Sequence, residues 1–130
     1  MHNRKEPDYN NYLEDVLTDL KGCVDIAKAA GVKDEQIILD PGLGFGKTYE
    51  NNMELMNHVE ILQKLGYPVL LGTSRKSMIG LSLDLPSDQR LEGTIATTVM
   101  GIMKGCRIIR VHDVKENKRA AIMTDKLLSY

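Results

Sequence analysis

The amino-acid sequence predicts an α/β protein in which parallel strands alternate with helices, and three observations lead to this prediction. Three short apolar runs, at residues 37–39, 68–71 and 107–111, are typical of strands buried in a sheet. A segment with helical periodicity and then a glycine precede each run, and a further helical segment follows the last one. The order is therefore α-β-α-β-α-β-α, which favours a parallel sheet covered on its faces by right-handed crossover helices.

The first three helices are predicted from apolar side chains that recur at steps of three and four residues. In the first helix, for example, Val16, Leu20 and Val24 share one face. A glycine after each segment is typical of a helix C-terminus, because glycine adopts positive φ values at little cost. The helices cover about residues 10–30, 51–65 and 90–104, and the glycines that end them are Gly31, Gly66 and Gly105.

The fourth helix is predicted to begin after Asp113 and to run to about Leu128. Asp113 is a suitable N-cap, and Glu116 stands three residues further on, which is the spacing of a capping box. In that arrangement the N-cap side chain accepts a hydrogen bond from the backbone of the first turn.

Length and composition indicate one globular domain without the excess positive charge that would attract polyanions. The chain has 130 residues, and 17 Lys and Arg against 18 Asp and Glu give a formal net charge of −1. We therefore expect no nucleic acid and no membrane as partners, since no apolar run approaches the ~20 residues of a membrane span. Residues 1–6 lack the apolar core of a signal peptide, which favours the cytoplasm. Cys23 and Cys106 form no C-x-x-C motif and are interpreted as reduced thiols, Cys106 as part of the core.

Polar residues gather directly after each predicted strand. In parallel α/β folds ligands bind at the carboxyl ends of the strands, so these segments are the place to expect a site. They are residues 40–48, 72–77 and 110–113.

The first of these segments is rich in glycine but matches neither common nucleotide motif. The P-loop pattern G-x-x-x-x-G-K-[ST] would need glycine where Pro41 stands, and the dinucleotide pattern G-x-G-x-x-G would need it where Lys47 stands. A glycine-rich loop without a ligand stays a possible interpretation. Asp40 favours a ligand, because it is a carboxylate at the mouth of the sheet with no obvious capping role.

The other two segments carry cationic side chains that suit an anion. Residues 74–77, Ser-Arg-Lys-Ser, begin a segment where free backbone N–H groups favour negative charge, although a solvated helix start would look the same. Arg110 and His112 stand two residues apart and would share a face of an extended strand. We expect them either to pair with carboxylates such as Asp40 or Asp113, or to bind an anionic ligand.

Taken in order, four segments of the sequence closely resemble the dihydropteroate synthase family, and the first four residues are similar to its Met-His-x-Arg signature. The resemblance covers nearly the whole chain. It implies that the fold is the second half of a TIM (β/α)8 barrel, since a complete barrel needs about 250 residues. Residues 1–130 would then be a partial pterin-binding domain. The four segments are 39–48, 71–77, 90–94 and 110–114.

The resemblance implies the reaction of that family, which joins 6-hydroxymethyl-7,8-dihydropterin pyrophosphate to p-aminobenzoate and forms 7,8-dihydropteroate for folate biosynthesis. Sulfonamides compete with p-aminobenzoate in this family. The implied mechanism is dissociative: pyrophosphate leaves first, and the amine then attacks the cation at the exocyclic carbon of the pterin. Such catalysis depends on fixed charge and a Mg²⁺ ion near the leaving group, with no protein nucleophile.

The resemblance also implies roles for residues near the pterin. Asp40 would accept hydrogen bonds from the 2-amino group and a ring N–H, as a carboxylate can accept two parallel N–H bonds. Lys76 would donate to the O4 and N5 side. Arg110 would stack on the pterin face and, with His112, receive the pyrophosphate. Lys76, Arg110 and His112 are thus the implied catalytic residues, and Met1 would form part of the pocket wall.

Three more residues complete the implied site. Phe45 and Ser77 would line the p-aminobenzoate pocket, and Gly72 would let a ligand approach the backbone closely. The metal ligands stay unassigned, because the resemblance places the Mg²⁺-binding asparagine in the first four strands of the barrel, outside this sequence.

Half a barrel leaves open questions of assembly and activity. Three strands cannot close a barrel, so we expect the chain to associate with the missing N-terminal half, to form a homodimer or to have limited stability, and the fragment alone to be inactive. Two other functions stay possible: a pterin-binding barrel of the methyltetrahydrofolate methyltransferase type, and a catalytically silent truncated remnant.

Overall fold

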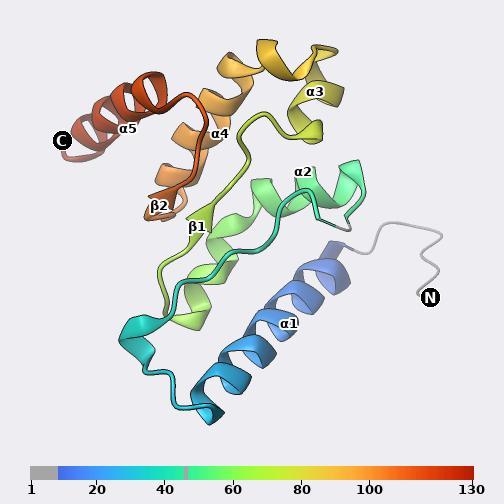
Figure 1. Cartoon of the computed structure of the whole chain (residues 1–130), viewed down its shortest axis with the longest axis vertical. Helices are drawn as coiled ribbons and strands as arrows, with labels where there is room; N and C mark the ends of the chain where they lie inside the picture. The colour runs from blue at the N-terminus through green and yellow to red at the C-terminus, as the bar shows by residue number, and fades with distance from the viewer. Residues whose placement is uncertain (1–8, 46) are drawn as a thin grey trace.

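The computed structural model describes residues 9–45 and 47–130. Helix α1 (Tyr9–Ala29) comes first, and the next strand segment is followed by α2 (Tyr49–Asn57). Strand β1 (Leu70–Leu71) is followed by the short α3 and by α4 (Leu91–Met103), and strand β2 (Ile108–Ile109) by α5 (Val114–Leu128). The predicted alternation of strands and helices is therefore confirmed (Figure 1). The remaining elements are α3 (Ser77–Leu83) and the 3-10 helices η1 (Asp34–Gln36), η2 (Val59–Leu65) and η3 (Ser87–Gln89).

The three predicted strands lie side by side, in sequence order, and all pairings are parallel. Leu39 bridges Val69, and β1 pairs with β2 in the register Leu70 with Ile108. The regular strands are shorter than predicted, at two residues each, and the first is reduced to the single bridge. A strand needs a hydrogen-bonding neighbour to extend its ladder. Within the described residues, the outer edges of the Leu39 segment and of β2 have no such neighbour.

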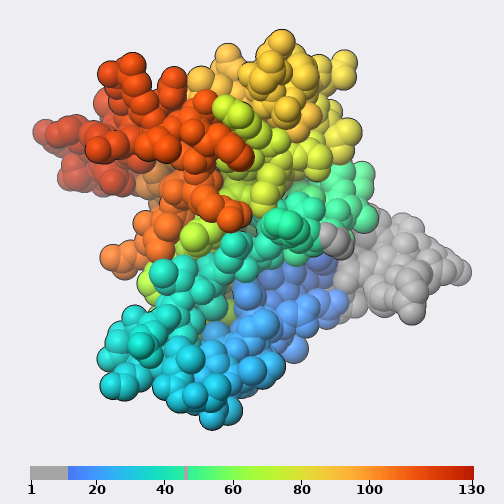
Figure 2. Space-filling model, in the orientation of Figure 1, coloured from blue at the N-terminus to red at the C-terminus, as the bar shows by residue number. Residues whose placement is uncertain are grey.

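The core lies between the strands and the helices on one side of them. Leu39, Val69 and Leu71 are buried from the strands, and Leu55 and Leu62 from α2 and η2 pack with them. The expected cover on both faces is wrong for this chain: Ile38, between two buried neighbours, is 54% exposed. Side chains alternate between the faces of a strand, so no helix of the described residues covers the face that Ile38 shares. In the space-filling view the molecule is hollowed between α5 and the segment after α1 (Figure 2).

The helix ends agree with the sequence in part. Gly31, Gly66 and Gly105 end helical segments with φ values of 97°, 82° and 96°, as predicted. The second helix, predicted as continuous, divides at His58 into α2 and the 3-10 helix η2. Helix α3 was not distinguished by periodicity, because seven residues are too few for a clear repeat.

The capping box predicted for the fourth helix is wrong. Asp113 is the N-cap residue of α5, but its side chain makes no capping hydrogen bond. The carboxylate is instead engaged by Arg75, 38 residues earlier in the chain, with an Nη2–Oδ1 distance of 3.0 Å. A long-range ion pair has replaced the local cap, which the spacing of Asp113 and Glu116 could not indicate.

We expect the isolated chain to associate in solution, because two strand edges and one strand face lack protein cover within the described residues. Unpaired backbone groups at sheet edges are templates for pairing with another chain. Size-exclusion chromatography with light scattering should therefore give species larger than a monomer. A monomeric peak with a single cooperative melt would contradict this expectation.

Candidate functional site

The carboxyl ends of the three strand segments bring Asp40, Gly72 and Arg110 to the same end of the sheet. Each residue directly follows the last paired residue of its segment, and the parallel register aligns those ends. The backbone N–H of Arg110 donates to the carbonyl of Leu71 at 2.9 Å, which fixes Arg110 beside Gly72. The prediction that these chain segments converge is therefore confirmed.

Gly72 provides the space in which the Arg110 side chain lies. A Cβ atom on Gly72 would be 3.0 Å from Nη2 of Arg110, closer than most real Cβ contacts. Gly72 is itself buried, and its φ is not in the left-handed region. The need for glycine here is therefore one of space: the guanidinium lies against the backbone that ends β1.

Lys76 joins this group, and its charge interacts with the other two strand ends. Burial lowers the pKa of the Lys76 ammonium below its usual range, and the Asp40 carboxylate opposes this shift. The positive charges of Arg110 and Lys47 lower the same pKa further. Asp40 and Arg110 thus both lie within electrostatic reach of Lys76.

The position of Lys76 is set by the glycine-rich loop. Its Nζ donates to the carbonyl oxygen of Leu43 and lies 4.7 Å from the centroid of the Phe45 ring. A Cβ on Gly44, where φ is 91°, would come within 3.0 Å of the Lys76 Cδ. Phe45 is 68% exposed, so its ring has one side near Lys76 and much of its surface open to solvent. The ammonium group and the face of the ring attract each other electrostatically.

The glycine-rich loop is held by hydrogen bonds to Lys47 and to α2. Lys47 donates to the carbonyls of Gly42 and Phe45, at 3.2 and 3.3 Å, so its ammonium group is hydrogen-bonded within its own loop. The N–H of Gly44 donates to Oδ1 of Asn52 at 2.8 Å. Asn52 is buried and lies on α2, and sequence reasoning missed it because nothing in the helical pattern marks an inward-facing amide.

The Asp40 carboxylate is only partly engaged by the described residues. Its Oδ1 accepts a hydrogen bond from the N–H of Gly42 at 2.9 Å, which orients the carboxylate. Oδ2 has no hydrogen-bond partner among the described residues, and the residue is exposed. The arrangement presents one free carboxylate oxygen, and one with a remaining lone pair, to a ligand with N–H groups.

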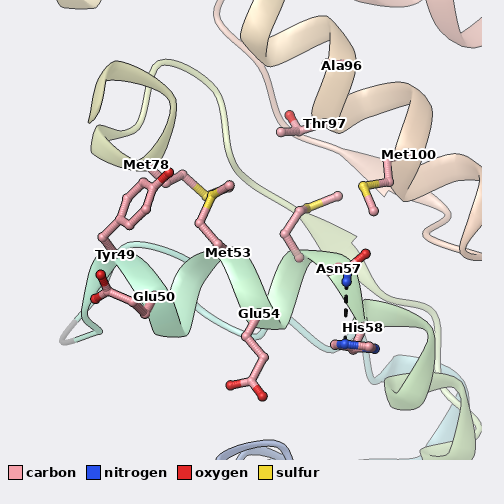
Figure 3. Close-up of a pocket in the computed structure, with 11 residues that line it drawn as sticks. Tyr49, Glu50, Met53, Glu54, Asn57, His58, Met78, Ala96, Thr97 and Met100 are labelled. Carbon is pink, nitrogen blue, oxygen red and sulfur yellow. Dashed lines mark hydrogen bonds between the residues drawn. The ribbon is translucent and has the colours of Figure 1, made fainter. Parts of the chain in front are cut away.

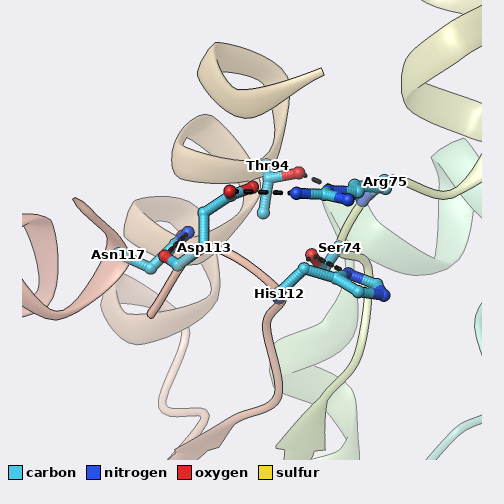
Figure 4. A network of polar contacts seen from close by, with 6 residues as sticks. All are labelled: Ser74, Arg75, Thr94, His112, Asp113 and Asn117. Carbon is cyan, nitrogen blue, oxygen red and sulfur yellow. Dashed lines mark hydrogen bonds and ion pairs between the residues drawn. The ribbon is translucent and has the colours of Figure 1, made fainter. Parts of the chain in front are cut away.

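Arg110 and His112 are both exposed, and within the described ranges neither forms an ion pair. The alternative in which Asp113 pairs with them is wrong, because that carboxylate pairs with Arg75. His112 instead has its Nδ1 2.7 Å from the hydroxyl oxygen of Ser74 (Figure 4). Two cationic-type side chains without carboxylate partners favour the other prediction, an anionic ligand.

Three other residues considered in the sequence analysis lie outside this group. Ser77 is exposed and is the first residue of α3, next to Lys76. Met1 lies outside the described residues. Cys106 is buried as predicted, and burial raises the pKa of its thiol to about 11, which disfavours the nucleophilic thiolate.

The described residues do not by themselves fit a magnesium ion. Within residues 9–45 and 47–130, no group of three or more His, Cys, Asp or Glu side chains is placed to hold a metal. The Mg²⁺ expected from the family resemblance therefore has no ligand set in this part of the chain.

An apolar groove on the helical side of the molecule is separate from the strand ends. It has a volume of about 610 Å³ between α2, α3 and α4, and Met53, Met78 and Met100 point into it, whereas Glu54 points away (Figure 3). No residue of the strand-end group lines it. We assign it no part in the site.

We expect Gly72→Ala to weaken anion binding at the strand ends about tenfold, because the new methyl group displaces the guanidinium of Arg110 from its place. Gly22→Ala is the matched control: a Cβ there meets nothing within 4 Å, and alanine in a helix stabilises by about 0.5–1 kcal/mol. Titration calorimetry with pyrophosphate checks this. Equal affinity in both variants would contradict the close packing of Gly72 and Arg110.

The fold is a segment of a parallel β/α barrel, with Asp40, Gly72 and Arg110 at the carboxyl ends of its strand segments. A family model described as pterin binding enzyme matches residues 1–112, and the chain belongs to that family. Among the described residues, no helix has both the length and the apolar character to cross a membrane.

Relatives of the chain include dihydropteroate synthases. Over 126 residues the chain is 68% identical to that of Clostridium beijerinckii, covering 96% of this chain and 47% of the relative. Over 129 residues it is 57% identical to that of Bacillus subtilis, covering 99% and 45%. The chain thus spans about half the length of the curated relatives it matches.

Solved structures agree with the sequence relatives. Dihydropteroate synthase from Clostridium difficile, determined in the presence of pteroic acid, superimposes with a TM-score of 0.88 at 51% identity, over 98% of this chain and 49% of that one. The Yersinia pestis enzyme with a sulfonamide drug complex gives 0.90 at 37% identity, over 97% and 46%. The predicted fold class, half of a (β/α)8 barrel, is confirmed.

Proposed function

We propose that this chain supplies half of the active site of a dihydropteroate synthase, and that residues 1–130 form a partial pterin-binding domain. The observation that carries the proposal is that Asp40 and Arg110, which follow two parallel strand segments, both lie within electrostatic reach of Lys76, in the loop after the strand between them. Relatives of known structure were determined with pteroic acid and with a sulfonamide drug. The proposed substrates are accordingly 6-hydroxymethyl-7,8-dihydropterin pyrophosphate and p-aminobenzoate.

Asp40 and Lys76 would recognise opposite edges of the pterin. The Asp40 carboxylate, oriented by Gly42, accepts hydrogen bonds from the 2-amino group and an adjacent ring N–H. The Lys76 ammonium donates toward the O4 and N5 side. The Phe45 ring near Lys76, together with Ser77, would border the p-aminobenzoate.

Arg110 and His112 would hold the leaving group. The bond between the exocyclic methylene carbon and the pyrophosphate oxygen breaks, and its electron pair leaves with the pyrophosphate. The amine nitrogen of p-aminobenzoate then bonds to that carbon and releases a proton to solvent. Arg110 contributes a fixed positive charge, and both Arg110 and His112 contribute hydrogen-bond donors, where negative charge develops on the leaving group. No step requires a protein nucleophile.

The proposal includes partners and a location. The complementary barrel half is the proposed macromolecular partner, with a homodimer of the completed barrel as the proposed assembly. A cytoplasmic location would keep the thiols of Cys23 and Cys106 reduced, as both are free.

Fragment complementation tests this function. The chain would be co-expressed with the N-terminal half of the Bacillus subtilis relative, to which it is 57% identical. The purified complex is expected to release pyrophosphate only when both substrates are present. A complex that binds pteroic acid but releases no pyrophosphate would favour the methyltransferase type of barrel. A complex that binds no pteroic acid would identify a silent remnant.

A further inference from the structure

We infer that Ser74 is a positioning residue that fixes the ring orientation and the tautomer of His112. Ser74 lies in the loop after β1 and is only 7% exposed. Its hydroxyl oxygen accepts the backbone N–H of His112 at 3.0 Å and lies 2.7 Å from Nδ1 of the same residue. One hydroxyl thus contacts both the backbone and the ring of His112 (Figure 4), which restricts the side-chain torsions between them.

The hydrogen-bond donors and acceptors around Ser74 determine whether the Ser74 hydroxyl or Nδ1 of His112 carries the proton that they share. A serine hydroxyl has one hydrogen to donate. Among the described residues, the only acceptor within hydrogen-bond distance of that hydrogen is Nδ1 of His112. If Nδ1 carried a proton, the buried hydroxyl would accept two hydrogen bonds and donate none. The arrangement that satisfies both groups has Ser74 donating to an unprotonated Nδ1, which places the ring proton of neutral His112 on Nε2.

A second set of contacts holds together the loop that carries Ser74 and the loop that carries His112. Arg75, the neighbour of Ser74, pairs with Asp113, the neighbour of His112, at 3.0 Å. Arg75 has a φ of 58°, uncommon for a non-glycine residue, and its carbonyl accepts from Nη1 of Arg90 at 2.8 Å. On the other loop, Asn117 donates to the carbonyl of Asp113 at 2.9 Å. The distance between Ser74 and His112 is therefore held from both sides.

The consequence for the reaction rests on the proposed function, in which His112 receives the pyrophosphate. Nε2 has no protein partner within the described ranges, and His112 is exposed. A neutral ring held by Ser74 presents Nε2–H as a donor in a fixed direction. Ser74 would thus act on the leaving group through His112 without touching it.

Histidine NMR on the full 130-residue chain tests the inference. The chain has three histidines, and a His112→Gln variant assigns the resonances of His112. At about pH 8, above the ordinary histidine pKa, the long-range ¹H–¹⁵N pattern is expected to identify Nδ1 as an unprotonated acceptor. Three-bond couplings should report a single χ1 rotamer. Ser74→Ala should move the Nδ1 resonance and average the couplings, and Ser74→Thr, which keeps the hydroxyl, should restore both.

Ser87→Ala is the matched control, because Ser87 is an exposed serine in η3. A protonated Nδ1 in the unmodified chain would overturn the inference, as would a Ser74→Ala variant with unchanged resonance and couplings.

Titration with pyrophosphate separates the positioning role of Ser74 from the proposed function. Binding about tenfold weaker in Ser74→Ala supports both, since one oriented hydrogen bond is lost. No binding to the unmodified chain counts against the leaving-group role alone, because the NMR signature does not depend on it.

Discussion

Arg110→Ala is expected to lower the turnover of the assembled enzyme by about 10²- to 10³-fold, the usual effect of removing one fixed group that stabilises developing charge. The guanidinium lies at the end of β2, against Gly72, and forms no ion pair with the described residues. Its charge is therefore available to the departing pyrophosphate. Steady-state release of pyrophosphate by the complemented barrel measures the effect, and the loss should appear mainly in kcat.

Arg107→Ala is the matched control for this prediction. Arg107 is an exposed arginine just before β2, so it stands at the opposite end of the same strand from Arg110. Its replacement removes the same charge and should leave turnover within about twofold, because surface charges far from a site are largely screened. Turnover that stays unchanged in Arg110→Ala, or that falls equally in both variants, would remove Arg110 from its proposed role.

Asp40→Asn is expected to weaken binding of pteroic acid by about 10- to 100-fold, equivalent to the roughly 1.5–3 kcal/mol of a hydrogen bond to a charged group. The amide keeps the shape of the side chain and an oxygen that can accept from the Gly42 N–H, so the loop should hold its conformation. It loses the negative charge and puts an N–H₂ group where the pterin also presents N–H donors. The result is one lost charge-assisted interaction and one repulsive contact.

Fluorescence titration of the complemented barrel with pteroic acid measures this change. Asp88→Asn, on the exposed helix η3, is the control with the same chemistry and should bind as the unmodified protein does. Comparable affinity in Asp40→Asn and Asp88→Asn would show that the carboxylate of Asp40 does not contact the pterin.

The sequence predicted what depends on local pattern. Strand and helix alternation follows from apolar periodicity, and Gly31, Gly66 and Gly105 mark helix ends because positive φ values favour glycine at those points. The convergence of Asp40 and Arg110 also followed, since residues after parallel strands meet at one edge.

What the sequence could not indicate depends on partners far along the chain. Asp113 looked like a local cap but pairs with Arg75, and the hydroxyl of Ser74 finds His112 38 residues later. The amide of Asn52 supports the glycine-rich loop from a helix that otherwise shows only an apolar repeat. Such side-chain pairings are decided by how the β/α units pack, and periodicity carries no information about them.

The most direct measurement of the central claim is an amide NMR titration of the complemented barrel with pteroic acid, with this chain alone labelled. If three strand ends form one pterin site, the amides of Asp40, Gly72 and Arg110 will shift together and fit a single dissociation constant. Shifts confined to one of the three loops, or three loops that follow different dissociation constants, would contradict a shared site.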